Sequence, residues 1–293
     1  MTVVDSGTKT LSRAEIRSDL SMLGLPVGSI YLIHSSLRRV GPLADGPSTL
    51  AEALRDVLGP RSTIVVPTFT ARNSTTTRRF RRLTVGMTPE QIATEEANIE
   101  GFDRLTTPAQ DVGAFAEFIR RSPAAVRSDH PQTSFTALGP SATELTRDHA
   151  LDCHLGERSP LAKLYTADAI VLLLGEGLEG VCTCFHLAEY RLPTPAPQRL
   201  FRCYVLKGGR RTLREFMAAE ADDSDFGRLG AAMAAGSPFV HSGWVGQTVA
   251  SWFPLRAAVD WMSGGVRDKP SSGLGETYDR GGRRDSSARG SSS

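Results

Sequence analysis

The sequence predicts an α/β fold in which a largely parallel central sheet is flanked by helices, with a long excursion beside the active site and a β-rich C-terminal portion. Short apolar runs rich in β-branched residues at 29–34, 63–66 and 170–174 have the length and composition of buried parallel strands. Segments whose apolar residues recur at helical spacing separate these runs. Such an alternation of strand and helix is typical of a parallel sheet.

The N-terminal part of the chain supplies the first strand and helix units. Residues 12–23 predict a helix, because Ser12 can cap its start and apolar residues recur at helical spacing after it. A strand at 29–34 follows. The next helix, at 50–58, stops at a Gly-Pro pair, and the next strand, at 63–66, is ended by a proline.

Residues 71–110 are polar and rich in threonine and arginine, which predicts a long excursion over the mouth of the active site. The arginine run at 78–82 is expected to be solvated surface, with the phosphates of a cofactor as an alternative partner. The remaining predicted elements are a helix at 111–120, a strand at 134–138, helices at 141–146 and 159–165, the strand at 170–174, a β-rich segment at 198–205 with a hairpin turn at 207–210, and a closing apolar segment at 245–262.

Composition limits the class of protein. Hydrophobic residues make up 40% and charged residues 23% of the chain, as in ordinary globular proteins. No apolar run approaches the length of a membrane span, and the N-terminus lacks the basic start and apolar block of a signal peptide. We therefore expect a cytoplasmic protein with no membrane partner. The four cysteines lack the spacing of a zinc or redox motif and are expected to be reduced thiols.

The net charge of +2 comes from the C-terminal segment 264–293, which contains six basic and four acidic side chains. The preceding residues are balanced, so overall charge gives no indication of a nucleic-acid partner. The same segment holds seven glycines and seven serines. We therefore expect one domain over residues 1–263 and a disordered tail over 264–293.

The most informative stretch is 170–191, in which a buried strand is followed by a short loop and a new helix. His186 and Glu189 lie three residues apart, on one face of that helix. Ligands of open α/β sheets sit at the carboxyl ends of the strands, and histidine is suited to taking up a proton near neutral pH. These residues indicate a general base with a supporting carboxylate. A core histidine beside a surface glutamate would have the same spacing.

Five motifs occur in an order and spacing that resemble the aminoglycoside 3-N-acetyltransferase family, over about residues 11–262. They are His34-Ser35-Ser36-Leu37, Pro67-Thr68-Phe69-Thr70, His130-Pro131-Gln132-Thr133-Ser134-Phe135, Gly156-Glu157-Arg158-Ser159-Pro160-Leu161 and Phe185-His186-Leu187-Ala188-Glu189. The resemblance implies an acetyl-CoA-dependent N-acetyltransferase that modifies the 3-amino group of a 2-deoxystreptamine aminoglycoside. It further implies antibiotic resistance and no requirement for a metal.

The resemblance also implies roles for individual residues. His186 is expected to deprotonate the amine, and Glu157 or Glu189 to orient the imidazole and to hold the cationic acceptor. A glutamate placed against a helix dipole is the alternative for Glu157. Asp103 is expected to face the acceptor. Contacts with the cofactor are expected from His34, Ser35, Ser36, Leu37, Val40, Thr68, Ser134 and Phe135.

Three departures from the family pattern bear on the acceptor. Cys182 stands where an asparagine is expected, the excursion is rich in arginine, and a glycine-serine tail replaces a compact ending. The first alternative function is therefore the same chemistry on another amine metabolite of a biosynthetic pathway. The second is a non-catalytic protein that binds coenzyme A or an antibiotic. A homodimer is compatible with the sequence, although no feature specifies one.

Overall fold

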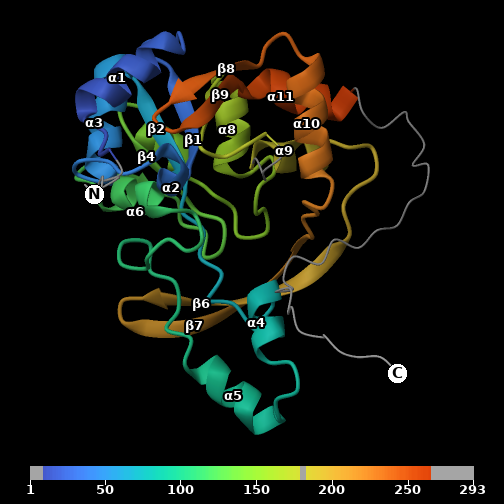
Figure 1. Cartoon of the computed structure of the whole chain (residues 1–293). Coiled ribbons are helices and arrows are strands. Elements are labelled where there is room, and N and C mark those ends of the chain that lie inside the picture. The colour runs from blue at the N-terminus through green and yellow to red at the C-terminus, as the bar shows by residue number, and fades with distance from the viewer. Residues whose placement is uncertain (1–8, 179–182, 265–293) are drawn as a thin grey trace, which may run out of the picture.

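The computed structural model of the chain describes residues 9–178 and 183–264 (Figure 1). Its strands are β1 (Ile30–Ser35), β2 (Thr63–Pro67), β3 (Val126–Arg127), β4 (Phe135–Leu138), β5 (Ile170–Leu174), β6 (Gln198–Lys207), β7 (Arg210–Ala219), β8 (His241–Val245) and β9 (Thr248–Pro254). Its helices are α1 (Arg13–Met22), α2 (Leu37–Val40), α3 (Pro47–Leu58), α4 (Arg78–Leu83), α5 (Pro89–Ala97), α6 (Ala114–Arg121), α7 (Ala142–Thr146), α8 (Pro160–Thr166), α9 (Cys184–Tyr190), α10 (Phe226–Gly236) and α11 (Leu255–Gly264). Within these residues no helix combines the length and apolar character that crossing a membrane requires.

The described strands form a seven-stranded sheet, in the order β3-β4-β2-β1-β5-β9-β8, and a separate hairpin of β6 and β7. The central strand β1 runs parallel to β2 and to β5, which are its two neighbours. On the outside, β4 is antiparallel to β2 and β9 is antiparallel to β5. The predicted α/β class with a parallel centre is confirmed. Each of these outer strands also pairs with the strand that precedes it in the chain, β4 with β3 and β9 with β8, in antiparallel orientation.

Helices cover both faces of the sheet because successive strand residues point to opposite sides. On β1, Tyr31 and Ile33 belong to the core cluster packed beneath α1, α3 and α6, whereas Leu32 belongs to the cluster packed beneath α8, α9 and α11. Figure 1 shows these two groups of helices on either side of the strands. The catalytic candidates on α9 therefore rest on a buried layer.

A second lobe lies at one end of the sheet and consists of the β6–β7 hairpin with α4 and α5 (Figure 1). The excursion is attached to this hairpin by isolated backbone pairings of Ser74 with Cys203 and of Phe102 with Val205. The predicted hairpin turn is confirmed, since Lys207 pairs with Arg210 across two glycines of positive φ. This lobe faces the end of the sheet at which the candidate site lies, and residues of both line the smaller cavity described below.

The structure adds elements that the sequence did not predict. Helix α4 begins after Thr77, whose hydroxyl accepts the backbone N–H of Phe80, and α5 begins with a capping box between Thr88 and Gln91. Both helices are too short and too polar to show an apolar periodicity, so their capping residues are the only sequence signal that indicates them. The helix predicted from residue 111 begins instead at Ala114, after a glycine with φ of 85°. Helix α10 was also not predicted. The proposed tail lies outside the described residues apart from its first glycine.

Candidate active site

His186 lies on α9, which follows the carboxyl end of β5 after a short loop. Its side chain is 8% exposed, and Nδ1 lies 2.7 Å from Oε2 of Glu189, whose side chain is 16% exposed. A carboxylate accepts hydrogen bonds, so Nδ1 carries the proton and Nε2 presents its lone pair. The ring also packs against Phe226, with centroids 4.7 Å apart. The pair is therefore held rigidly with one basic nitrogen available.

Glu157, the other carboxylate proposed to support His186, lies elsewhere. Its side chain is 52% exposed and forms an ion pair of 2.6 Å with Arg191. The guanidinium of Arg191 in turn stacks over the ring of Tyr165, at 3.8 Å from its centroid. Of the two carboxylates left open by the sequence, the one beside the imidazole is Glu189.

The loop before Glu157 fixes the position of α9. A Cβ atom on Gly156 would lie 2.2 Å from Cδ1 of Tyr190, at the end of that helix, so a larger residue would displace either the loop or the helix. Through this close contact the Gly-Glu-Arg-Ser-Pro segment supports the helix that carries His186, although the side chain of Glu157 is exposed to solvent.

The segment proposed to contact the cofactor borders the start of α9. Nε2 of His34 lies 3.2 Å from the hydroxyl of Thr183, the residue before that helix. Ser35 and Ser36 are half-buried at the end of β1, and Leu37 is partly buried against the core. Val40 is completely buried in the core, so its side chain does not reach a ligand.

Thr68, Ser134 and Phe135 are completely buried as well. The hydroxyl of Ser134 donates to the carbonyl of Thr68 at 2.7 Å and accepts from Nε of Arg127 at 3.0 Å. Phe135 packs edge to face with Phe69 at 5.6 Å. These three residues thus support the wall of the cleft from behind, and Phe69 is the residue that lines it.

Asp103 caps a turn. Its Oδ1 accepts the backbone N–H groups of Leu105 and Thr106, each at 2.8 Å. The bond from the Thr106 backbone is the largest of the causes that lower the pKa of Asp103. Local hydrogen bonds therefore account for this carboxylate, and the structure does not bring it to His186.

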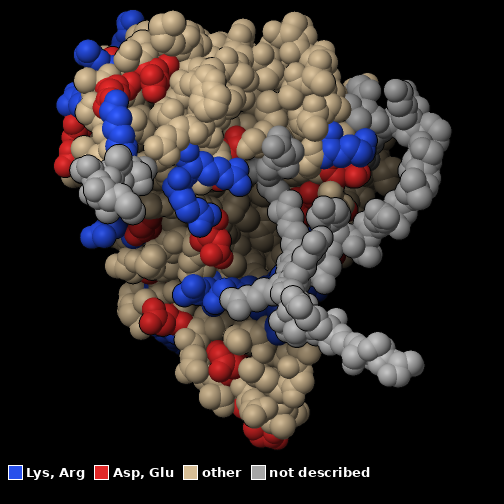
Figure 2. Space-filling view, viewed as in Figure 1, with Lys and Arg blue, Asp and Glu red and all other residues tan. Residues whose placement is uncertain are grey.

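Two adjoining cavities, of about 780 and 360 Å³, open between the sheet and the second lobe. His186 lines the smaller one. Ala71, Gln110 and Asp111 line both, which makes them the border between the two. Charged groups of both signs surround the hollow between the lobes (Figure 2). The imidazole therefore faces a hollow that continues past this border into the larger cavity.

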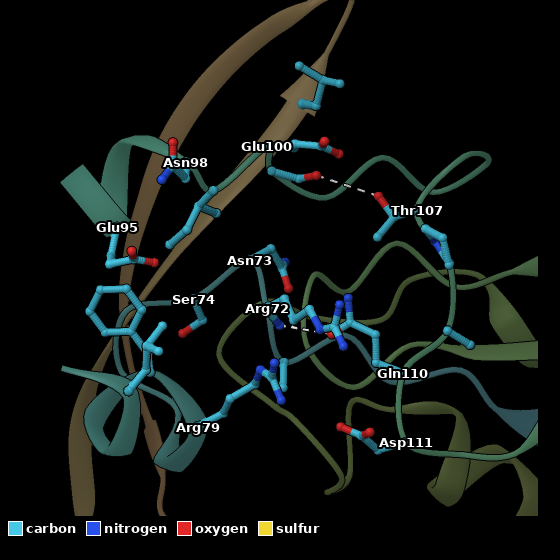
Figure 3. Close-up of a pocket in the computed structure, with 18 of the residues that line it drawn as sticks. Arg72, Asn73, Ser74, Arg79, Glu95, Asn98, Glu100, Thr107, Gln110 and Asp111 are labelled. Carbon is cyan, nitrogen blue, oxygen red and sulfur yellow. Dashed lines mark hydrogen bonds between the residues drawn. The ribbon is translucent and has the colours of Figure 1, made fainter. Parts of the chain in front are cut away.

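Charged side chains of the excursion line the larger cavity (Figure 3). Arg72, Arg79 and Asp111 lie around it, and none of the three forms an ion pair with a residue that the structure describes. Asp111 has a φ of 58°, a conformation that aspartate tolerates better than most residues. Asp111 was not predicted from the sequence. An aspartate two residues before a glycine is common in loops and does not indicate a binding residue.

Three histidines beneath the smaller cavity, His130, His149 and His154, are buried. The nitrogens of His130 and His149 face main-chain and hydroxyl groups, whereas Nε2 of His154 has no hydrogen-bond partner. In the described part of the chain no three histidine, cysteine or acidic side chains are placed to hold a metal ion. Cys153, Cys184 and Cys203 are buried, and neither Cys153 nor Cys203 forms a disulfide. Cys182 lies outside the described residues.

A cleft lined by a buried imidazole–carboxylate pair at a strand end is the arrangement of an enzyme site suited to general acid–base chemistry. The family model for aminoglycoside 3-N-acetyltransferase matches residues 32–264. The chain belongs to this family and is an acyltransferase.

Relatives support the same assignment along most of the chain. The SPbeta prophage-derived aminoglycoside N(3')-acetyltransferase-like protein YokD of Bacillus subtilis is 33% identical over 88% of this chain and 93% of its own length. Aminoglycoside N(3)-acetyltransferase VII of Streptomyces paromomycinus is 36% identical over 74% of this chain and 73% of its own.

Solved structures share the fold. The crystal structure of YokD has a TM-score of 0.82 at 31% identity and covers 92% of this chain and 98% of that one. AAC-IIIb, in a binary complex with CoASH, has a TM-score of 0.74 at 28% identity over 87% of this chain and 96% of that one. AAC-VIa bound to sisomicin has a TM-score of 0.73 at 27% identity over 87% and 97% of the two chains.

Proposed function

We propose that this protein transfers the acetyl group of acetyl-CoA to the 3-amino group of a 2-deoxystreptamine aminoglycoside. The observation that carries the proposal is the buried pair of His186 and Glu189, which opens onto the smaller cavity. Relatives described with CoASH and with sisomicin make coenzyme A and aminoglycosides the first ligands to consider.

In the proposed reaction His186 is the general base. Its Nε2 takes a proton from the acceptor's amine while Nδ1–H donates to Glu189. The imidazolium formed in this way is stabilised by the carboxylate at 2.7 Å. Because both side chains are largely withdrawn from water, that attraction is screened less than it would be on the surface. Glu157 takes no direct part, since it is paired with Arg191.

Acetyl-CoA would supply the acetyl group as a thioester. We assign the cofactor to the half-buried segment 34–37, whose hydroxyls and main-chain groups border the start of α9 at the end of β1. In this proposal His34, Ser35 and Ser36 hold the cofactor. Thr68, Ser134 and Phe135 contribute by supporting the wall behind it.

For the acceptor, we propose that Asp111 takes the place first assigned to Asp103. It lies at the border of the two cavities, has no cationic partner among the described residues, and would attract an ammonium group toward the imidazole. Acetylation would remove a positive charge that an aminoglycoside uses to bind RNA, which is the physical basis of the proposed resistance.

Arg72 and Arg79 favour a second candidate acceptor. Two guanidinium groups without an ion-pair partner in the described residues suit a carboxylate or phosphate. They would bind either the phosphates of the cofactor or an acidic group on a different amine metabolite. Substituting both by glutamine separates these cases, because the first raises the KM for acetyl-CoA and the second raises the KM for the amine.

The function is tested by incubating the protein with acetyl-CoA and a panel of aminoglycosides, beside simple and acidic amines. The proposal predicts release of free thiol with 2-deoxystreptamine compounds, a product one acetyl group heavier, and NMR shifts that place this group on the 3-amino nitrogen. Acetylation of an acidic amine alone would support the second candidate. Binding of both ligands without thiol release would contradict both.

A further inference from the structure

A layer of three buried histidines lies under the smaller cavity, and one of them differs from the other two. His149 is satisfied by Ser128 and by main-chain carbonyls. His130 faces the carbonyl of Leu151 with one nitrogen and accepts main-chain N–H groups with the other. Nε2 of His154 is buried and has no hydrogen-bond partner. An unpaired polar atom of this kind is costly and calls for a function.

His154 shares the smaller cavity with His186. Only 6% of the residue is exposed, so the part of the ring that reaches the cavity is limited. The two imidazoles are near enough for the charge of one to influence the other. A ligand that fills this cavity therefore meets both imidazole side chains.

The neighbours of His154 fix which nitrogen carries its proton. The hydroxyl of Thr133 lies 2.9 Å from the carbonyl of His154, to which it donates, and 3.4 Å from Nδ1 of the same residue. It also lies 3.1 Å from Nδ1 of His130, which already accepts two main-chain N–H groups. Having given its hydrogen to the carbonyl, that hydroxyl can only accept from Nδ1–H of His154. Nε2 therefore bears a lone pair and acts as a hydrogen-bond acceptor.

Packing holds this acceptor in place. The ring of His154 lies 4.4 Å from that of Phe201 and 4.8 Å from that of His130, measured between centroids. Burial, followed by the nearby charges of His149, Arg199 and His186, lowers the pKa of His154 to about 3. The ring is thus neutral at physiological pH and accepts without competing with His186 for a proton.

We propose that Nε2 of His154 accepts a hydrogen bond from a second N–H or O–H group of the acceptor while His186 acts on its reacting amine. This inference rests on the proposed acetyl transfer and adds a residue that selects the acceptor. The other polar lining supports a ligand rich in donors. Asp111 and the buried Oε1 of Gln132, which has no hydrogen-bond partner, offer further acceptor oxygens in this cavity. The carboxylates of Glu220 and Asp223 are paired with Arg199 and Arg78.

The pantetheine arm of coenzyme A is the other source of an N–H group at this place. Its amides carry carbonyl oxygens as well as N–H groups and so need donors in addition to acceptors. An aminoglycoside carries mainly amino and hydroxyl groups, which are donors. It therefore suits the unpaired acceptors of this cavity better than the pantetheine arm does. The two sources predict different kinetic changes when Nε2 is removed.

The test uses the full chain with His154→Phe, which keeps an aromatic ring against Phe201 but has no lone pair, and His154→Gln, which restores an acceptor. His241→Phe is the matched control, because His241 is exposed on β8, outside both cavities. For each protein the kcat and both KM values are measured by thiol release. Binding of kanamycin and of CoASH is measured by calorimetry, and thermal unfolding reports on folding.

Leaving a donor of the ligand unpaired in a buried site costs about 1–3 kcal/mol, so His154→Phe should raise the KM and the calorimetric Kd for the aminoglycoside roughly 5- to 150-fold. The KM for acetyl-CoA should not change, and the His241→Phe control should keep the constants of wild type. His154→Gln should recover part of the lost affinity for the aminoglycoside. A rise confined to acetyl-CoA, or unchanged constants in both folded variants, would overturn the inference. If wild type itself transfers no acetyl group, the proposed function fails instead, whereas the calorimetry still reports on His154.

Discussion

Replacing Glu189 by glutamine should lower kcat while leaving the fold intact. Glutamine has nearly the size of glutamate, and its amide oxygen can still accept from Nδ1–H of His186, so the change removes the negative charge alone. A hydrogen bond to a charged group contributes about 1.5–3 kcal/mol. At 2.7 Å, with side chains only 8% and 16% exposed, the pair belongs in this range. The expected loss in kcat is therefore roughly 10- to 150-fold.

Glu157→Gln provides the comparison for this prediction. That carboxylate is 52% exposed and pairs with Arg191, and such surface pairs contribute about 0–1 kcal/mol to stability. Its kcat should stay close to that of wild type. The assay is thiol release at saturating acetyl-CoA and aminoglycoside. Equal losses in the two variants, or a Glu189→Gln enzyme as fast as wild type, would refute the assignment of Glu189 as the supporting carboxylate.

Three further predictions concern stability. Arg127→Met should lower the free energy of unfolding in urea by about 3 kcal/mol or more, because the buried guanidinium donates hydrogen bonds to the carbonyls of Thr68, Arg104 and Thr107 and to the hydroxyl of Ser134, all of which the variant lacks. A change below about 1 kcal/mol would contradict this. Gly156→Ala should lower both kcat and the thermal midpoint of unfolding, because its added methyl group would collide with Tyr190 on α9. Gly236→Ala is the control and should leave kcat unchanged, since no atom lies within 4 Å of the added methyl group. Equal behaviour of the two variants would contradict the packing argument. Burial lowers the pKa of His149 to about 4 and that of His154 to about 3, from an ordinary 6.5. Between these values and pH 6.5, the two histidines bind protons in the unfolded chain but not in the folded protein. Stability is then fully present above pH 6.5 and falls by about 1.4 kcal/mol per pH unit for each histidine below it, and identical urea midpoints at pH 7 and pH 5 would contradict this sign.

The central part of the fold could be predicted because buried strands and amphipathic helices leave local signals. The apolar runs at 29–34, 63–66 and 170–174 became the three adjacent strands of the sheet centre. The pair His186 and Glu189 could also be predicted, since three residues on a helix bring side chains to the same face.

The rest of the site depends on contacts between distant residues. Glu157 could not be separated from Glu189 by sequence, because its partner Arg191 lies 34 positions further along the chain. Asp111 and His154 reach the cavities only through the packing of the excursion and the histidine layer, and neither is marked by a local motif. Thr68, Ser134 and Phe135 occur within motifs, yet motifs do not reveal that their side chains are buried.

The central claim is that His186 removes the proton from the acceptor's amine. The most direct measurement is thiol release from acetyl-CoA with gentamicin, kanamycin and neomycin, comparing wild type with His186→Ala. General-base catalysis predicts that the variant remains folded and binds CoASH but loses about 10²- to 10⁴-fold in kcat. Turnover by a folded His186→Ala protein at the rate of wild type would contradict the proposed mechanism.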